Sequence, residues 1–261
     1  MTNAPPTKIW YQSFIEPGKD RPYFDKLGEF LGTLAAPGVS YELNGIDPPD
    51  RELHRITEFR CAAQVVRNAL KAQGQGYDAF AIGHYQDSGL YEARAAVNIP
   101  VLGMGEASML FACSLGRNFA LVGIDPIFIP IHEECVARYG LRDRYVGIKV
   151  VETKVQDLVE AFTDPEAPER MFTQFRKQVQ PLVDAGAEVI IPAGGLFATL
   201  FAGLKNLTVG KAIVLNPISV LAKWTEMAVF LKRVMGTGTA RALSFSTPSE
   251  KAVREFLDSL A

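Results

Sequence analysis

The sequence has few of the residues on which several classes of protein depend. Its three cysteines, Cys61, Cys113 and Cys135, are odd in number and form no CxxC pair, which argues against a disulfide framework and a Cys-based zinc site. Lys and Arg number 27 against 29 Asp and Glu, so no basic excess can neutralise phosphates, and we expect no nucleic-acid partner. Apolar runs break well before the roughly 20 residues that a membrane-spanning helix needs. Residues 1–7 lack the charged and apolar regions of a signal peptide. We therefore expect a globular, cytoplasmic protein without a membrane partner.

Short apolar runs alternate along the chain with helical patterns, which is typical of βαβ units and a parallel sheet. Strands are predicted at residues 8–11, 40–43, 79–83, 100–102, 119–122, 145–151, 189–191 and 212–215. Helices are predicted at residues 21–34, 52–73, 131–139, 172–185, 196–203 and 219–234, with shorter ones after residues 89 and 103. Residues 236–247 read as a loop before a final short helix.

An internal repeat divides the chain into two related halves. Residues 76–85 align without gaps to residues 186–195, and each segment holds a helix end, an acidic residue, a buried strand and a small-residue turn. We therefore predict two pseudo-symmetric, Rossmann-like α/β domains whose parallel sheets face each other across a central cleft. The first domain is predicted to comprise residues 1–103 and 216–261, and the second residues 104–215.

Ligands of open parallel sheets bind outside the carboxyl ends of the strands. Two facing halves would bring together the residues that follow each strand, namely 12–13, 84–87, 103–108, 124–125, 194–195 and 216–219. This placement predicts where the cleft lies, but it does not predict the chemistry.

His84 is the first candidate for that chemistry, because it follows a buried strand and an imidazole can exchange protons near neutral pH. Asp87 would orient it or cap the following helix. The alternative is a strand-end histidine bonded to a carbonyl group, with Asp87 as an N-cap only.

Gly194 and Gly195 occupy the matching place in the second half. Their backbone N–H groups could stabilise an anion or a developing oxyanion, or the two residues could simply form a tight turn. The GxG at residues 103–105 lacks the full GxGxxG of a dinucleotide loop, so a helix start with Glu106 in its first turn is favoured. Glu106 or Ser108 could still point into the cleft.

His54 and Glu58 share one face of a predicted helix, and a solvated or inter-helix face is favoured over a metal site. Arg60 could bind a carboxylate but is expected at the surface. Residues 132–134 (His-Glu-Glu) read as a helix start, and no metal is expected there. The motifs GxSxG, GxxxxGK[ST] and HExxH are absent from the sequence.

Three segments resemble the aspartate/glutamate/hydantoin racemase superfamily, most closely its hydantoin racemase branch. Residues 83–109 (GHYQDSGLYEARAAVNIPVLGMGEASM) are similar to its first catalytic loop. In the family, a strand is followed there by Cys, an aromatic residue, any residue, Asp, Pro or Ser, Gly and Leu, and then by the pattern IPVxGxGEA. Residues 185–196 (AGAEVIIPAGGL) resemble its second catalytic loop, and residues 215–229 (LNPISVLAKWTEMAV) the segment after it. The resemblance implies two α/β domains across a cleft and homo-oligomeric assembly. It also implies two cysteines that act without a cofactor on a carbon next to a carbonyl group.

The sequence departs from this pattern at the positions that carry the chemistry. The repeat places His84 at the first cysteine position and Gly194 at the second, and the family's Asn-Pro-Asn appears here as residues 11–13 (YQS). Stereoinversion needs proton removal on one face and delivery on the other, so the two-thiol route is excluded. Relatives with one catalytic cysteine decarboxylate arylmalonates, so the loss of one base is compatible with an enzyme.

We therefore predict a cofactor-independent enzyme acting next to the carbonyl of a small carboxylate, lactone or cyclic amide, with isomerisation as the family's default and decarboxylation as another possibility. His84 with Asp87 would be catalytic, and the N–H groups of Gly194 and Gly195 would stabilise an enolate. The side chains expected at the substrate are those of Gln12, Ser13, Tyr85, Gln86, Glu106, Ser108, Asn216 and Ser219. One alternative is a hydrolase in which His84, with Asp87 or Glu106, activates water, with or without a metal. The other is a catalytically inactive protein that binds a small ligand.

Overall fold

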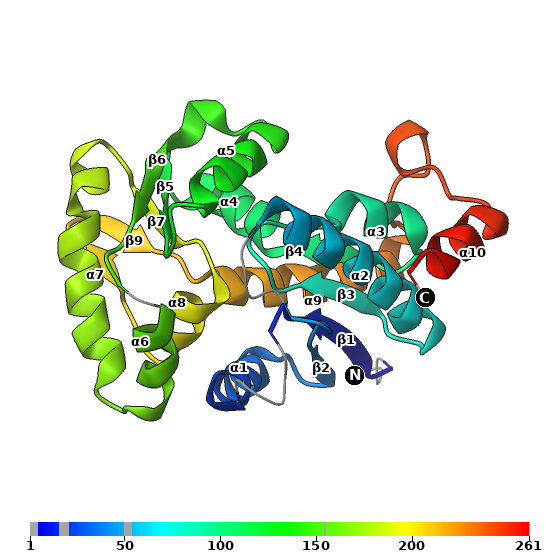
Figure 1. The fold of residues 1–261 in the computed structure, drawn as a ribbon, viewed down its shortest axis with the longest axis horizontal. Coiled ribbons are helices and arrows are strands. Elements are labelled where there is room, and N and C mark those ends of the chain that lie inside the picture. Colours follow the sequence, from blue (N-terminus) through cyan, green and yellow to red (C-terminus); the bar gives the residue numbers. More distant parts are fainter. Residues whose placement is uncertain (1–4, 16–20, 50–53, 154, 261) are drawn as a thin grey trace.

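The computed structural model describes residues 5–15, 21–49, 54–153 and 155–260, and it contains two sheets (Figure 1). The first sheet has the order β2-β1-β3-β4, with β1 (Thr7–Gln12), β2 (Val39–Asn44), β3 (Ala79–Ile82) and β4 (Val101–Gly103), all parallel. The second has the order β6-β5-β7-β9-β8, with β5 (Phe119–Gly123), β6 (Tyr145–Val150), β7 (Val189–Pro192), β8 (Thr208–Val209) and β9 (Ala212–Val214). Only β8 pairs antiparallel among the described strands. The predicted fold class is confirmed. The two-residue β8 was not predicted, because it is too short to produce an apolar run.

The helices follow the strands as the alternation predicts. They are α1 (Arg21–Leu34), α2 (Arg55–Gly74), α3 (Leu90–Ala96), α4 (Met104–Leu115), α5 (Phe128–Arg138), α6 (Val155–Glu160), α7 (Ala167–Asp184), α8 (Gly195–Leu200), α9 (Pro217–Met235) and α10 (Glu250–Asp258). Three short 3₁₀ segments are η1 (Arg142–Arg144), η2 (Ala161–Thr163) and η3 (Leu243–Phe245). The predicted start of α2 at residue 52 lies outside the described residues, and α6 and η2 were not predicted. None of the described helices is long and apolar enough to cross a membrane.

The two halves repeat each other in their hydrogen bonds as well as in their strand order. The N–H of Gly83 donates to the carbonyl of Gln12, and the N–H of Ala193 donates to the carbonyl of Val122. Both the donors and the acceptors are 110 positions apart (83 and 193, 12 and 122), which is the offset of the sequence repeat. Positions 84 and 194 are therefore equivalent in the two halves. The predicted domain limits themselves stay a prediction.

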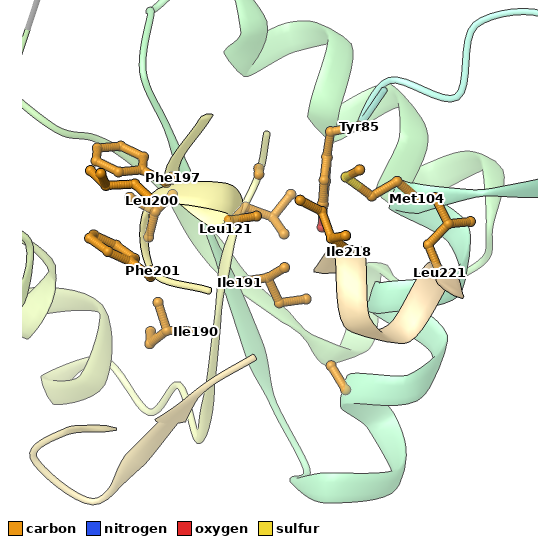
Figure 2. Packing of buried hydrophobic residues seen from close by; sticks show 14 of the residues in the cluster. Tyr85, Met104, Leu121, Ile190, Ile191, Phe197, Leu200, Phe201, Ile218 and Leu221 are labelled. Carbon is orange, nitrogen blue, oxygen red and sulfur yellow. The ribbon is translucent and has the colours of Figure 1, made fainter. Parts of the chain in front are cut away.

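A continuous apolar core joins the halves. Strands β3 and β7 are buried at every residue, because helices cover both faces of each parallel sheet. Figure 2 shows Tyr85 beside Ile218 of α9. Leu121 and Ile191 of the second sheet lie between this pair and Phe197 of α8. Each such buried side chain contributes roughly 1.5–3 kcal/mol to folding. Helix α9 packs against β3, α4 and α8, so it connects the two sheets (Figure 1).

Candidate active site

His84 lies in the turn between β3 and α3, at the carboxyl edge of the first sheet. Its side chain is 15% exposed, and its ring stacks on Phe14 with the centroids 3.9 Å apart and the planes at 10°. Phe14 follows β1, the strand beside β3, so the two rings meet because both strands end at the same edge. The aromatic stacking limits the ring to one orientation and covers one of its faces.

Glu58 is the charged partner of His84. Its Oε1 lies 3.6 Å from His84 Nε2, and its Oε2 accepts a 2.5 Å hydrogen bond from Ser88 Oγ. The carboxylate is almost fully covered, and neither Glu58 Oε1 nor His84 Nδ1 has a hydrogen-bond partner. Burial of Glu58 contradicts the solvated face that was predicted as one of two alternatives, and the inter-helix alternative stays a prediction. The start of α2 lies close to the turn that carries His84. His54 instead caps α2 at the surface.

The sequence contained a signal that Glu58 would lie near the strand ends. In parallel α/β units each helix begins at the edge where its preceding strand ends. Glu58 stands in the first turn of the helix after β2, and an acid in that place lies near the other strand ends. The sequence spacing placed Glu58 on the same helix face as His54, and it gave no indication that Glu58 would lie near His84.

The Glu58–His84 pair can carry out proton transfer. A carboxylate beside an imidazole holds the ring and compensates the positive charge that forms when the ring takes a proton. Nε2 faces this carboxylate at 3.6 Å, and Nδ1 is buried without a hydrogen-bond partner. Among the described residues, no three His, Cys, Asp or Glu side chains come together as a metal site requires.

The side chain of Asp87 binds groups of the protein other than His84. Its buried carboxylate accepts hydrogen bonds from the N–H groups of Gly105 (3.0 Å) and Glu106 (2.6 Å) and from the hydroxyl of Tyr139 (2.7 Å). Burial raises the pKa of Asp87 to about 7, against the opposing effect of these hydrogen bonds. Asp87 thus caps α4 and not the helix that follows it directly. The predicted role of orienting His84 is corrected accordingly.

The GxG at residues 103–105 has a structural explanation in this cap. A β-carbon on Gly103 would overlap the carboxylate of Asp87, and one on Gly105 would overlap the carbonyl oxygen of Tyr85. The glycines let the start of α4 approach the His84 turn closely. They therefore serve the packing of that turn and give no support to a dinucleotide loop.

His132 lies behind the His84 turn, fully buried in the middle of α5 and not at a helix start as predicted. Its ring stacks on Phe128 at 5.6 Å and meets the ring of Tyr85 edge-on at 5.2 Å. Neither ring nitrogen has a hydrogen-bond partner. Burial and, to a smaller extent, the electrostatic effect of His84 lower the pKa of His132 to about 3. His132 therefore stays neutral at physiological pH.

The remaining predicted residues of the first half also have partners inside the protein. The amide of Gln12 donates to the carbonyls of Ser13 and Gly45, and its oxygen accepts from Trp10 Nε1 and Asn68 Nδ2. These hydrogen bonds occupy the side chain of Gln12 and hold the end of β1 in place.

Three further residues of this set are held in the same way. Glu106 forms a partly buried ion pair with Arg94. The hydroxyl groups of Tyr85 and Ser108 hydrogen-bond each other at 3.3 Å. Gln86, next to Tyr85 in the chain, and Ser13, directly after β1, are also buried. The predicted contacts of these residues with a substrate stay predictions.

The second turn, at the end of β7, contains Gly194 and Gly195, both half-buried. Gly194 is extended (φ 165°), and a β-carbon added to it would have nothing within 4 Å. A β-carbon added to Gly195 would lie 2.6 Å from Tyr23 Oη, which belongs to the first half. Near it, Asn216 caps α9 by accepting from the N–H groups of Ile218 and Ser219, and donates to the carbonyl of Ala198. The side chain of Asn216 is therefore occupied, and Ser219 is half-buried.

A cavity of about 470 Å³ lies between α1 and the region of η2 and α8, where Lys26, Phe162 and Thr199 line it. It contains none of the residues predicted for the site. The candidate chemistry is therefore concentrated at the His84 turn and its neighbours.

Residues 29–225 match the family profile described as Asp/Glu/Hydantoin racemase. Over 194 residues the chain is 27% identical to the hydantoin racemase of Pseudomonas sp. (strain NS671), covering 74% of each protein. It is 26% identical to the hydantoin racemase of Rhizobium meliloti, covering 70% of this chain and 71% of that one. Its fold is similar to that of the allantoin racemase from Klebsiella pneumoniae, with a TM-score of 0.76 and 22% identity, covering 94% of each chain.

Proposed function

The chain belongs to the Asp/Glu/hydantoin racemase family, and from this premise we propose that it is an isomerase-type enzyme using His84 to move a proton next to the carbonyl of a small cyclic amide. The observation that carries the proposal is the Glu58–His84 pair at the end of β3. The pair stands at the position where the family resemblance expects the first catalytic cysteine. A histidine with a carboxylate partner is a proton-transfer group that can replace a thiol there.

In the proposed reaction, the imidazole of His84 takes the proton from the carbon beside the carbonyl group. The electron pair of the broken C–H bond forms an enolate, whose negative charge lies on the carbonyl oxygen. Glu58 compensates the charge on the imidazolium, and the N–H groups of Gly194 and Gly195 are proposed to face the enolate oxygen. The substrate's own carbonyl group accepts the electrons, so the reaction needs no cofactor.

The charges around His84 favour a neutral ring over an acidic amino acid. Glu58 is an anion beside His84, and two arginines of the neighbouring helices are paired with acids. Arg55 donates to Glu134, and Arg94 to Glu106. A dicarboxylate would meet the Glu58 carboxylate here, whereas a hydantoin-like ring carries no charge to repel. The names of the relatives, hydantoin racemase and allantoin racemase, agree with a cyclic substrate.

A substrate screen in D₂O tests the proposal. The protein is incubated with both enantiomers of 5-benzylhydantoin, with allantoin, aspartate, glutamate, an arylmalonate and a small lactone, and each reaction is followed by NMR. We expect exchange of the α-proton of a cyclic amide, above the rate without enzyme, which vanishes in His84→Ala and persists in His54→Ala. His54 is a matched control because it is an exposed histidine outside the turn.

Other outcomes of the same screen identify the alternatives. Loss of CO₂ from the malonate would indicate a lyase, and ring opening would indicate a hydrolase. Exchange that survives in His84→Ala would contradict the role of His84, and no conversion of any compound would contradict the proposed reaction. Cytoplasmic location and homo-oligomeric assembly belong to the same proposal, and fractionation with light scattering would test them.

A further inference from the structure

The proposed function leaves one proton unassigned, and the following inference rests on that function. Inversion at a carbon requires one group that removes a proton and a second group on the opposite face that delivers one. His84 accounts for the first group. Its equivalent in the second half is Gly194, which has no side chain.

Tyr23 brings a hydroxyl group to this second turn. It stands in the first turn of α1, which begins at the carboxyl edge of the first sheet, and its side chain reaches the second half. Its ring meets Phe162 of η2 edge-on, with the centroids 5.5 Å apart and the planes at 72°. Its Oη lies 2.6 Å from the place that a β-carbon of Gly195 would occupy. Glycine at position 195 is therefore what lets the hydroxyl group approach the turn.

Tyr11 provides a contrast within the same half. Its ring occupies the space where a side chain of Gly83 would lie, so it stands at the His84 turn and not at the Gly194 turn. Its hydroxyl group is fully buried and has no hydrogen-bond partner. Two buried tyrosines thus fill the space beside two glycine turns, and Tyr23 is the one on the side that lacks a proton carrier.

We propose that Tyr23 is the second proton-transfer residue of this enzyme and acts on the substrate face opposite His84. After His84 has taken the α-proton, the Oη–H bond of Tyr23 breaks and its proton forms the new C–H bond on the other face. The enolate electrons supply that bond, and the carbonyl group is restored. The phenolate and the imidazolium then return to their starting forms by exchanging protons with water.

Tyr23→Phe separates exchange from inversion. The probe is each enantiomer of 5-benzylhydantoin in D₂O, with exchange followed by NMR and inversion by chiral chromatography. We expect inversion to fall by about 100-fold or more, while the enantiomer whose proton faces His84 still exchanges it with retention of configuration. The phenyl ring preserves the packing against Phe162, and urea unfolding checks the fold. Tyr77→Phe is the matched control, because it is a buried tyrosine before β3, at the opposite end of that strand from the His84 turn, and we expect it to invert at the wild-type rate.

Two variants at the glycine turn extend the test. Gly195→Ala should displace the Tyr23 hydroxyl group and give the same loss of inversion. In the Tyr23→Phe background, Gly194→Cys should restore inversion at least tenfold and Gly194→Ala should not, because the extended backbone and open space at 194 accept a side chain. Equal behaviour of Cys and Ala there would overturn the inference that this turn lacks a proton carrier.

The results distinguish the inference from the function beneath it. If wild-type protein exchanges no α-proton, or exchanges it without His84, the proposed function fails and the role of Tyr23 falls with it. If exchange depends on His84 but folded Tyr23→Phe inverts both enantiomers at the wild-type rate, only the inference fails. Loss of exchange for both enantiomers in folded Tyr23→Phe would also overturn it, because a second carrier is not needed for exchange on the His84 face.

Discussion

The turn after β3 and the turn after β7 begin with equivalent strand hydrogen bonds but differ in the side chains that they carry. The first holds His84, packed between Phe14 and the carboxylate of Glu58. The second holds Gly194, beside which a β-carbon would have nothing within 4 Å. The same strand hydrogen bonds support both turns. The repeated strand ends therefore place equivalent positions in the two halves, and the sequence puts an ionisable side chain at only one of them.

Alanine at the two equivalent positions gives the largest predicted difference between the turns. His84→Ala should lower turnover of the substrate identified by proton exchange by about 10²–10⁴-fold, the usual contribution of a general acid or base. Gly194→Ala should lower it by less than tenfold, because the position is open and extended. Initial rates of both purified variants measure the effect, and equal losses would show that the turns are not chemically distinct.

The second prediction concerns the carboxylate that only the first turn has. Glu58→Gln removes the charge beside His84 Nε2 and should lower turnover by about 100-fold, since the ring loses its charged partner and its fixed orientation. Glu92→Gln, at an exposed acid of α3 near the same turn, is the control and should have wild-type activity. Activity of Glu58→Gln within twofold of wild type would remove Glu58 from the mechanism.

The third prediction compares the room available at the two strand ends. A methyl group on Gly83 would overlap the ring of Tyr11, so Gly83→Ala should lower the free energy of unfolding by about 1–3 kcal/mol. The same change at Gly194 should alter it by less than about 1 kcal/mol. Urea unfolding of the two variants measures this difference, and similar losses of stability would contradict the open space at Gly194.

The smallest predicted effect is a pH dependence of stability that is confined to the first turn. The pKa of Asp87 is raised to about 7, so its contribution is fully present below about pH 4 and is lost as the pH rises to about 7. The pKa of His132 is lowered to about 3, so its contribution is present above about pH 6.5 and is lost as the pH falls. Each effect is at most about 1.4 kcal/mol per pH unit, and between about pH 4 and pH 6.5 they oppose each other.

Two substitutions separate these effects. In His132→Phe only the effect of Asp87 remains, so the free energy of unfolding should decrease from about pH 4 to pH 7. In Asp87→Asn only the effect of His132 remains, so the free energy of unfolding should increase from about pH 4 to pH 6.5. Urea unfolding across this range measures both. Parallel curves for wild type and the two variants would contradict the pKa directions.

Much of the fold was predictable because its signals are local. The apolar runs of β3 and β7 and the small residues after them predicted both strands and both turns. The repeat of residues 76–85 in 186–195 predicted the equivalence of positions 84 and 194, and the strand hydrogen bonds agree with that offset. The predicted substrate contacts were harder to derive, because Gln12, Glu106 and Asn216 use their polar groups within the protein. Polar residues at strand ends can order a turn as readily as they bind a ligand.

The sequence by itself determined the two α/β halves, the resemblance to the racemase family and the place of His84 at a strand end. These follow from residues that are neighbours along the chain, whose apolar runs and glycine turns act over a few positions. Only the tertiary structure decided that Glu58 faces His84, that Asp87 caps α4 and that Tyr23 reaches Gly195. These partners come from separate helices and turns, and their meeting depends on how the helices pack at the edges of the two sheets.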